Sequence, residues 1–379
     1  MAILHILTPE YPPATGGVAD YTRLIARKLA QAGDAVHVWC PPNAEREPAD
    51  LVTVHPEMGQ FRAVDLARVG ALLDRFERPR RLLVQWVPQG YGFRAMNLPF
   101  CCWLWNRARR GDDVELMVHE PYLAFWVGTW RQTAAAAVHR AMTIVLLQAA
   151  RRVWVAIPAW ESKWKPYALG RSIPFTWLPI SSGLPLPEPQ AVSDARNVLG
   201  GLSRPLVGHL GTYGVAVASL LSDALAELFQ RADAPHVLLM GSGGREFLTK
   251  FSQRHPLSVT RISATGPLSE SELAVHVAAC DLLVQPYPDG ISSRRTTAMA
   301  GLRLGVPIVT TTGALTEPFW ETSGAVRLSP VGNAKSLVEH MEQLLRHPGE
   351  RTRLASLGKT FYDGMFDVRR TVAALRMAA

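Results

Sequence analysis

The sequence is poor in cysteine and has no long hydrophobic run. Only four cysteines occur among 379 residues, and the only close pair, Cys101 and Cys102, is adjacent. This spacing argues against a disulfide framework and provides no set of zinc ligands. No apolar stretch approaches the length that crosses a membrane. We therefore expect no metal site, no resident cofactor and a reducing compartment.

Signals for secretion and for nucleic-acid binding are also lacking. The apolar run Ile3 to Leu7 is short, and Pro9, Pro12 and Pro13 follow it at once, unlike the pattern of a secretory leader. We expect a cytoplasmic protein. Because no helix-turn-helix, zinc-finger or RNA-binding signature is evident, nucleic acid is not an expected partner.

The net charge of +8 is local. Residues 75–171 contain 15 Arg and Lys against 6 Asp and Glu, a balance of +9, so the rest of the chain is nearly neutral. Nine of the eleven tryptophans lie in the overlapping stretch from Trp86 to Trp177. Surfaces that combine aromatic rings with arginine suit anionic acceptors, protein partners or membrane interfaces.

Within this region, the apolar segment 96–105 leads into Arg107, Arg109 and Arg110. Two interpretations are equally supported. An exposed segment could insert Trp103 and Trp105 into an anionic membrane and give peripheral contact with its inner face. Alternatively, the segment is a buried helix whose tryptophans pack in a core.

Apolar runs alternate with amphipathic stretches in both halves of the chain. Ile3 to Leu7 and Val36 to Trp39 flank a stretch with helical periodicity, and the same pattern returns at 206–210 and 237–240. Further strands are expected at 282–285 and 306–309. Repeated strand and helix units predict an α/β fold with a parallel sheet in each half and ligands at the carboxyl ends of the strands.

The length and composition predict two domains. A chain of 379 residues with 48% hydrophobic residues can fill two cores. Residues 180–189 are rich in Pro, Gly and Ser, as in a linker. We predict an N-terminal domain over residues 1–183 and a C-terminal domain over 190–361, with a final helix at 362–379 that could complete the first domain.

Small polar loops follow several of the predicted strands. They contain the pairs Gly16 and Gly17, Gly211 and Thr212, and Gly241 and Ser242. Glycine permits close approach of the backbone, and N–H groups at a helix start can face an anion. A plain turn explains each pair about as well, so we treat them as candidate donor-binding residues.

The sharpest local feature is the loop 289–297, which leads from a predicted strand into a helix. Its hydroxyls, backbone donors and two guanidinium groups suit a diphosphate. Because one arginine could instead form an ion pair, we favour a phosphate contact for either Arg294 or Arg295. The candidate donor-binding residues here are Gly290, Ile291, Ser292, Ser293, Arg294, Arg295 and Thr297.

His119 follows the apolar run Leu116 to Val118, which places it at a predicted strand end. A histidine taken alone is more often structural, and only this edge position makes His119 a candidate for catalysis. Glu10, Asp20 and Tyr21, near the first glycine-containing loop, are the candidate acceptor-side residues.

Taken in order, these motifs resemble the retaining glycosyltransferases of family 4. Their GT-B architecture has two facing Rossmann-like domains with an interdomain cleft. Further carriers of the resemblance are Val207-Gly208-His209-Leu210, Gly266-Pro267-Leu268, and Ala298-Met299-Ala300-Gly301 before Gly305-Val306-Pro307-Ile308-Val309. The resemblance implies that Gly16, Gly17 and His119 lie near the donor sugar and that the second domain holds the nucleotide.

The sequence departs from the family pattern at the donor site. Two glutamates seven residues apart are matched by Asp289 and Thr297, and threonine cannot offer a ribose diol two acceptor oxygens. The family's diphosphate-binding Arg and Lys are matched by His209 and Gly214. Since a leaving diphosphate needs positive charge or oriented donors, we interpret Arg294 and Arg295 as a relocated phosphate clamp.

The resemblance implies transfer of a sugar from a nucleotide diphosphate sugar to a glycan, lipid-linked or small-molecule acceptor, with retention of anomeric configuration. His119 and Asp289 are then the candidate catalytic residues. An inverting enzyme that uses Asp20, Glu10 or His119 as base is one alternative. A catalytically silent sugar-nucleotide binder or partner subunit is another, and an epimerase of the same architecture is a weaker third.

Overall fold

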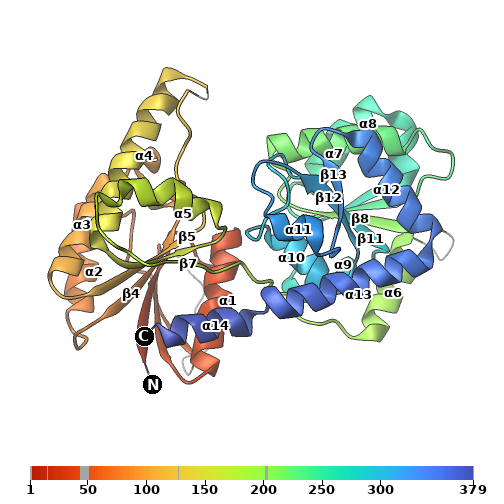
Figure 1. Cartoon of the computed structure of the whole chain (residues 1–379). Helices are drawn as coiled ribbons and strands as arrows, with labels where there is room; N and C mark the ends of the chain where they lie inside the picture. Colours follow the sequence, from red (N-terminus) through yellow and green to blue (C-terminus); the bar gives the residue numbers. More distant parts are fainter. Residues whose placement is uncertain (1, 15, 43–50, 127, 201–203, 379) are drawn as a thin grey trace. The chain divides into compact units, whose positions relative to one another are not determined.

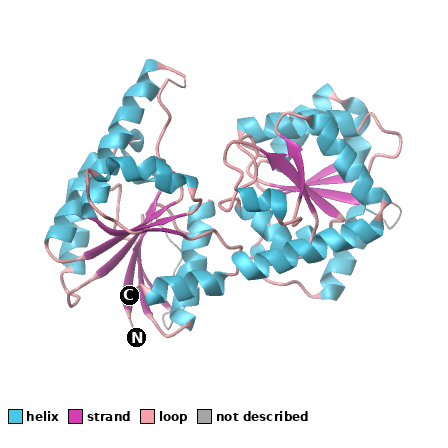
Figure 2. Cartoon of the chain, viewed as in Figure 1, coloured by secondary structure: helices cyan, strands magenta, loops and turns pink. Residues whose placement is uncertain are grey.

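The computed structural model describes residues 2–14, 16–42, 51–126, 128–200 and 204–378. Contacts within the chain divide it into two compact units, Met1–Ile180 with Val368–Ala379, and Ser181–Asp367. Each unit contains a parallel sheet with helices on both of its faces (Figures 1 and 2). The predicted class, α/β with two parallel-sheet Rossmann-like domains, is confirmed.

The sheet of the first unit has seven strands in the order β3-β2-β1-β4-β5-β6-β7, all parallel. The strands are β1 (Ile3–Leu7), β2 (Ala35–Trp39), β3 (Val52–His55), β4 (Arg81–Trp86), β5 (Asp113–Val118), β6 (Ala150–Val155) and β7 (Phe175–Trp177). The helices are α1 (Gly17–Gln31), α2 (Ala63–Leu73), α3 (Leu98–Arg109), α4 (Trp130–Ala149), α5 (Ala159–Trp164) and α14 (Val368–Met377). Short 3-10 turns lie at Pro88–Tyr91, Phe93–Ala95 and Lys165–Ala168.

The sheet of the second unit has six parallel strands in the order β10-β9-β8-β11-β12-β13. The strands are β8 (Leu206–Leu210), β9 (His236–Met240), β10 (Ile262–Gly266), β11 (Leu282–Gln285), β12 (Ile308–Thr312) and β13 (Arg327–Pro330). The helices are α6 (Pro189–Gly200), α7 (Val215–Leu228), α8 (Gly244–Arg254), α9 (Glu270–Ala278), α10 (Thr296–Arg303), α11 (Pro318–Thr322), α12 (Ala334–Arg346) and α13 (Pro348–Met365). A 3-10 turn lies at Pro256–Arg261.

The strands are mostly apolar because helices cover both faces of each sheet. In the second unit, for example, Val207 and Val284 pack against helices α7 and α12, which contribute Leu225 and Met341. A capping box is present at the start of α9, with Ser269 and Glu272 each bonded to the other's backbone N–H. Local signals and core packing therefore define the same elements.

The order of the strands locates the place where ligands bind in such sheets. In the first unit, β2 and β3 follow β1 on one side of the sheet, whereas β5, β6 and β7 follow β4 on the other side. In the second unit β8 and β11 are the corresponding neighbours. Ligands of open parallel sheets bind at the carboxyl ends of the two strands where the order reverses. The loops after β1, β4, β8 and β11 are therefore where functional residues are expected.

The segment between the units and the end of the chain have defined contacts. Ser181 Oγ donates to Phe366 O over 2.6 Å, and Ser182 N donates to the Tyr362 hydroxyl over 3.1 Å, so the start of the predicted linker is held by the end of α13. The last helix, α14, packs on α1 in the first unit, where Arg376 pairs with Asp34. Helix α13 extends to Met365 within the second unit.

Within the part of the chain that the structure describes, no helix is both long enough and apolar enough to cross a bilayer.

Candidate functional site

The loop after β1 folds back on the start of α1. One oxygen of the Glu10 carboxylate accepts the Ala19 N–H over 3.1 Å. A side chain at Gly16 would overlap this carboxylate, so glycine leaves the room that the Glu10 carboxylate occupies. Glu10 thus satisfies one of the free N–H groups at the helix start. Gly17, the first residue of α1, is exposed.

His119 follows β5 directly and is 7% exposed. Its Nε2 lies 2.7 Å from Gln85 Oε1, at the end of the adjacent strand β4. Because that oxygen can only accept, Nε2 carries the proton and Nδ1 is the acceptor of the ring. Burial lowers the pKa of His119 to about 3, so the imidazole is neutral at pH 7. Its backbone carbonyl accepts the Trp160 indole N–H over 3.0 Å.

The two other predicted acceptor-side residues differ in environment. Tyr21 is buried and its ring meets His119 edge to face, with centroids 5.2 Å apart. Burial raises the pKa of Tyr21 well above its ordinary value. Asp20 lies on the exposed side of α1. The structure thus brings Tyr21 and His119 together and leaves Asp20 on the surface.

In the second unit, the loops after β8 and β9 lie against each other. Gly211 N donates to Met240 O over 3.1 Å. Gly241 has a φ of 111°, and a side chain there would overlap Gly211 O, so both its conformation and its contacts require glycine. Thr212 and Ser242 are exposed at this edge. Four predicted donor-binding residues therefore share one small surface.

His209, which replaces an arginine of the family pattern, cannot take over its charge. The residue is 1% exposed, and its Nδ1 lies 2.8 Å from Val284 O. Burial lowers the pKa of His209 to about 4, which keeps the ring neutral. Nε2 has no hydrogen-bond partner among the described residues. Gly214 caps α7 and is exposed.

The loop after β11 is organised around Asp289. Its Oδ2 accepts from Arg294 Nη2 over 2.5 Å, and its Oδ1 pairs with Arg295 Nη2. The Arg295 guanidinium also lies 4.5 Å from the centre of the Tyr287 ring, whose hydroxyl bonds to Thr297 Oγ1 over 2.7 Å. The predicted phosphate clamp and the predicted sugar contact are therefore one ion-paired cluster.

The middle of this loop is fastened to the rest of the unit. Ser293 N and Oγ both donate to the Glu317 carboxylate, over 3.0 Å and 2.5 Å. Ile291 N donates to Thr311 O over 2.8 Å, and Gly290 N to Tyr287 O over 3.1 Å. Ser292 is fully buried. These residues shape the loop, while the paired arginines and Asp289 are its partly exposed charged groups.

Two residues of the site were missed by sequence reasoning, Gln85 and Glu317. Gln85 orients His119, and burial raises the pKa of Glu317, which accepts from Ser293 and from the Trp320 indole over 2.9 Å. A signal for the first exists, because Leu-Leu-Val-Gln occurs at 82–85 and again at 282–285. These are the corresponding strands β4 and β11 of the two sheets. No local signal points to Glu317.

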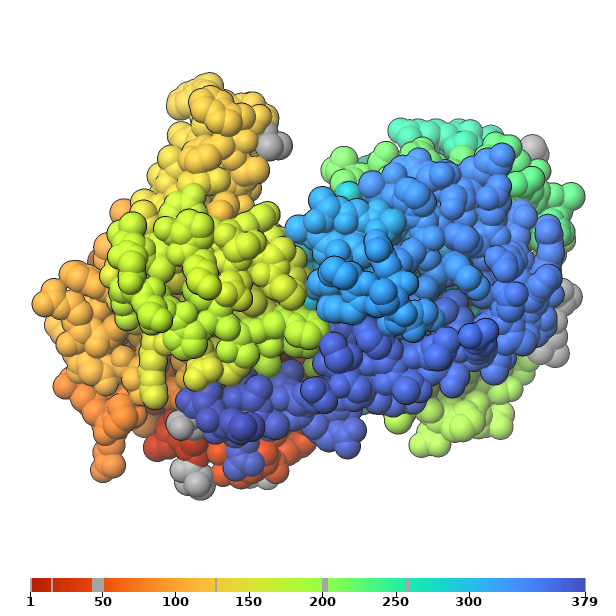
Figure 3. Space-filling view, in the orientation of Figure 1, coloured from red at the N-terminus to blue at the C-terminus, as the bar shows by residue number. Residues whose placement is uncertain are grey.

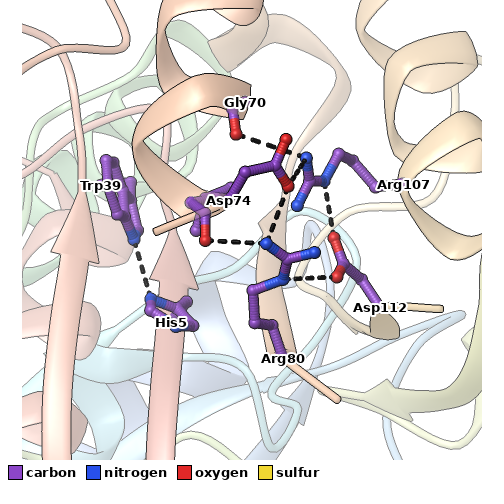
Figure 4. A network of polar contacts seen from close by, with 8 residues as sticks. His5, Trp39, Gly70, Asp74, Arg80, Arg107 and Asp112 are labelled. Carbon is purple, nitrogen blue, oxygen red and sulfur yellow. Dashed lines mark hydrogen bonds and ion pairs between the residues drawn. The ribbon is translucent and has the colours of Figure 1, made fainter. Parts of the chain in front are cut away.

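Most of the segment 96–105 lies in helix α3 together with Arg107 and Arg109, and Arg110 is the C-cap of that helix. Arg107 is 2% exposed, and its Nε donates to the buried Asp112 over 2.6 Å. The same network includes the buried Arg80 and the exposed Asp74 (Figure 4). Trp103 is half-buried, whereas Trp105 is 39% exposed beneath Arg109. Arg107 is therefore committed to the core and is unavailable to a membrane.

Comparison with known proteins agrees with the fold. Residues 204–347, which lie in the second unit, match the family model described as Glycosyl transferases group 1. No curated protein is similar enough in sequence to match the chain.

Solved structures resemble the whole chain at low sequence identity. Sucrose-phosphate synthase from Thermosynechococcus elongatus is 16% identical with a TM-score of 0.76, covering 100% of this chain and 98% of that one. HepE from Anabaena, in complex with UDP and glucose, is 17% identical with a TM-score of 0.71 and 99% coverage of both chains. WaaG, a glycosyltransferase involved in lipopolysaccharide biosynthesis, is 14% identical with a TM-score of 0.70, covering 99% of this chain and 98% of that one.

The similarity to these solved structures shows the fold, and the family model that matches residues 204–347 indicates the class of enzyme. The chain has the GT-B fold and carries a glycosyl transferases group 1 domain, which identifies it as a glycosyltransferase.

Proposed function

We propose that the protein transfers a sugar from a nucleotide diphosphate sugar to an acceptor hydroxyl. The observation that carries the proposal is the Asp289, Arg294 and Arg295 cluster, which lies after β11 in the domain that matches the glycosyltransferase family. Carboxylates bind sugar hydroxyls, and arginines bind phosphate oxygens. The solved complexes of HepE with UDP and with UDP-glucose support a nucleotide sugar as the donor.

The proposed roles follow the chemistry of each group. Arg294 or Arg295 binds the diphosphate and compensates the charge that develops on it as the sugar leaves. The loops at Gly211 and Gly241 offer backbone groups to the nucleotide. In the second unit, Asp289 hydrogen-bonds a sugar hydroxyl. In the first unit, the neutral His119 offers its Nδ1 as acceptor to a hydroxyl of a substrate.

We further propose that the reaction retains the anomeric configuration. The bond from the anomeric carbon to the phosphate oxygen breaks while the acceptor oxygen attacks from the same face, and the acceptor proton passes to the leaving phosphate. This route needs no protein base. Its support is that the candidate bases are poorly suited: the pKa of His119 is lowered to about 3, and Glu10 is engaged at the start of α1. Asp20 is exposed and remains the candidate base for an inverting reaction.

A catalytically silent binder is the second candidate, and one observation favours it. His209 is buried and neutral, and both candidate clamp arginines are paired with Asp289, so the charge facing a diphosphate is partly neutralised. Such a protein would bind the nucleotide sugar without turning it over.

Turnover separates the candidates. The full chain is incubated with UDP-glucose, GDP-glucose or ADP-glucose, and release of nucleoside diphosphate is measured with water and with supplied glycan or lipid-linked acceptors. The proposal expects release from at least one donor, and the anomeric configuration of the product, read by NMR, decides retention. Binding of a donor with no release under any condition supports the silent binder. Absence of both binding and release would refute both.

A further inference from the structure

Large apolar side chains are exposed together at one projecting part of the first unit. In the loop 121–126, Leu123 is 44% exposed, Phe125 38% and Trp126 85%, and Trp130, the first residue of α4, is 76% exposed. We name these four residues the aromatic tip. In Figures 1 and 3, the start of α4 and this loop stand out from the body of their unit. Exposed indoles of this size, gathered at one place, indicate an interaction surface.

The aromatic tip is held in place by two residues of α4. His139, which is 3% exposed, accepts the Leu123 N–H at Nδ1 over 3.3 Å. Arg140 donates to Leu123 O over 2.9 Å, and its guanidinium lies 3.6 Å from the centre of the Phe125 ring. Leu123 and Phe125 are thus held at the surface by specific contacts.

A second exposed turn adjoins the aromatic tip through the same histidine. His139 Nε2 lies 2.8 Å from Ala95 O, so one imidazole joins the 93–95 turn to the loop that carries Leu123. Phe93 is 49% exposed, and Arg94 is exposed beside it. Phe93, Arg94 and Ala95 all have positive φ, at 50°, 54° and 68°. Backbone strain of this kind clusters at functional sites.

The stretches of sequence that contain these loops carry charge of one sign. No Asp or Glu occurs between Glu120 and Glu161, nor between Glu77 and Asp112. Arg131, beside Trp130, is exposed and its guanidinium lies 5.6 Å from the centre of that indole. Together with Arg94, it places cations next to the exposed rings. The surface therefore complements a partner that is both apolar and anionic.

We propose that the aromatic tip docks the protein on the surface of an anionic lipid bilayer. Tryptophan side chains prefer the membrane interface, where the ring lies among acyl chains and the indole N–H stays near water. Arginines beside them attract acidic head groups, each contributing about 1 kcal/mol. A projecting tip suits a deformable bilayer, whereas a protein partner would need a matching hollow. This surface differs from helix α3, whose Arg107 is buried.

Vesicle binding by the full chain tests the proposal. Sedimentation with vesicles of phosphatidylglycerol and phosphatidylcholine is compared with sedimentation with phosphatidylcholine alone. We expect binding to the anionic vesicles that weakens as salt rises. The double change Trp126→Ser and Trp130→Ser should weaken it by about tenfold or more. Arg131→Glu should also weaken it. Since these side chains are exposed, the melting temperature should not change.

Trp105→Ser is the matched control, because Trp105 is another exposed tryptophan with an adjacent arginine. Its binding should equal that of the wild type. The proposal is overturned if the wild type does not bind anionic vesicles, if the double variant binds as well as the wild type, or if only Trp105→Ser reduces binding. It is also overturned if the wild type does not bind vesicles but self-associates, and the double variant no longer self-associates. The assay contains no nucleotide sugar, so its failure would leave the proposed function standing.

Discussion

Arg294 Nη2 lies 2.5 Å from Oδ2 of Asp289. Arg295 pairs with the other oxygen of the same carboxylate, and the three side chains are between 17% and 26% exposed. A diphosphate that binds this cluster competes with Asp289 for the guanidinium groups. The carboxylate thus determines how much positive charge the loop presents to a nucleotide.

Asp289→Asn tests this competition. Removing the carboxylate charge should strengthen binding of the nucleoside diphosphate by up to about tenfold, because a negative charge next to the phosphates is lost. Transfer should slow, since a sugar contact is lost with it. Calorimetric titration and a turnover assay measure the two effects. Asp289→Glu, which keeps the charge, should leave diphosphate affinity close to that of the wild type. Weaker diphosphate binding by Asp289→Asn would contradict the competition.

His119→Ala tests the neutral imidazole next to Gln85. The change leaves Gln85 Oε1 buried without its hydrogen bond, so we expect a loss of about 1–3 kcal/mol in the free energy of unfolding. Turnover should fall by about a hundredfold, well beyond the loss of folded protein. His236→Ala is the control, because His236 also loses a side-chain bond, to Ser263, but lies at the amino end of β9. Equal losses of activity in the two variants at equal stability would make His119 structural.

The buried ion network of the first unit predicts a large effect on stability. The Asp112 side chain is fully buried and accepts from Arg80 Nε over 2.7 Å and from Arg107 Nε over 2.6 Å. Burial alone would raise the pKa of Asp74, but hydrogen bonds and charges of Arg107 and Arg80 hold it below its usual range. Asp112→Ala leaves the two buried guanidinium groups with Asp74 as their remaining ion-pair partner and removes their buried one, which should cost up to about 3–5 kcal/mol in urea unfolding. Arg109→Ala, at an exposed position of α3, should cost little. A small cost for Asp112→Ala would show that water or rearrangement replaces the carboxylate.

Three neighbouring histidines of β1, β2 and β3 predict sensitivity to acid. The His5 and His37 rings stack at 5.1 Å, and His37 Nδ1 lies 3.0 Å from His55 Nε2. Burial and the adjacent imidazoles lower the pKa of His5 to about 3 and that of His55 to about 4, and burial also lowers the pKa of His37. The Trp39 indole donates to His5 Nδ1, which must therefore be unprotonated.

The sign of this effect follows from proton linkage. Below pH 6.5 these histidines bind protons in the unfolded chain but remain unprotonated in the folded one. The free energy of unfolding therefore falls as pH falls toward 4. The slope should reach about 1.4 kcal/mol per pH unit for each histidine. Urea unfolding at several pH values measures it. The double change His5→Phe and His55→Phe should reduce the pH dependence of the free energy of unfolding between pH 6 and pH 4, roughly by the contribution of two histidines. An unchanged slope would assign the acid sensitivity to other groups.

Much of the fold could be predicted from apolar patterns, and one error has a physical reason. The strands at 3–7, 206–210 and 282–285 have the predicted bounds. The strand predicted at 306–309 instead spans Ile308–Thr312. Its last residues are threonines whose hydroxyls are satisfied inside the sheet, Thr310 by Gln285 O and Thr311 by Tyr287 O. A pattern based on apolar residues ends before them.

The candidate site was predictable only as separate segments. The position of His119 at a strand end follows from the local sequence, but its contact with Gln85, 34 residues away, depends on the pairing of β4 with β5. Likewise, the charges of Arg294 and Arg295 were evident from the sequence, whereas their shared attachment to Asp289 depends on the path of the loop. Contacts formed by tertiary structure have no local signature.

The central claim is that a glycosyltransferase has moved its phosphate-binding charge to Arg294 and Arg295. Calorimetric titration of UDP, GDP and ADP into the wild type and the Arg294→Ala, Arg295→Ala double variant tests it most directly, with Arg254→Ala, exposed at the far end of α8, as the control. The account predicts that the wild type and the control bind one of these nucleotides equally well. The double variant should lose about 1.5–3 kcal/mol of binding free energy, as expected for a charge-assisted contact. Equal affinity in the double variant, or no binding of any nucleotide by the wild type, would contradict it.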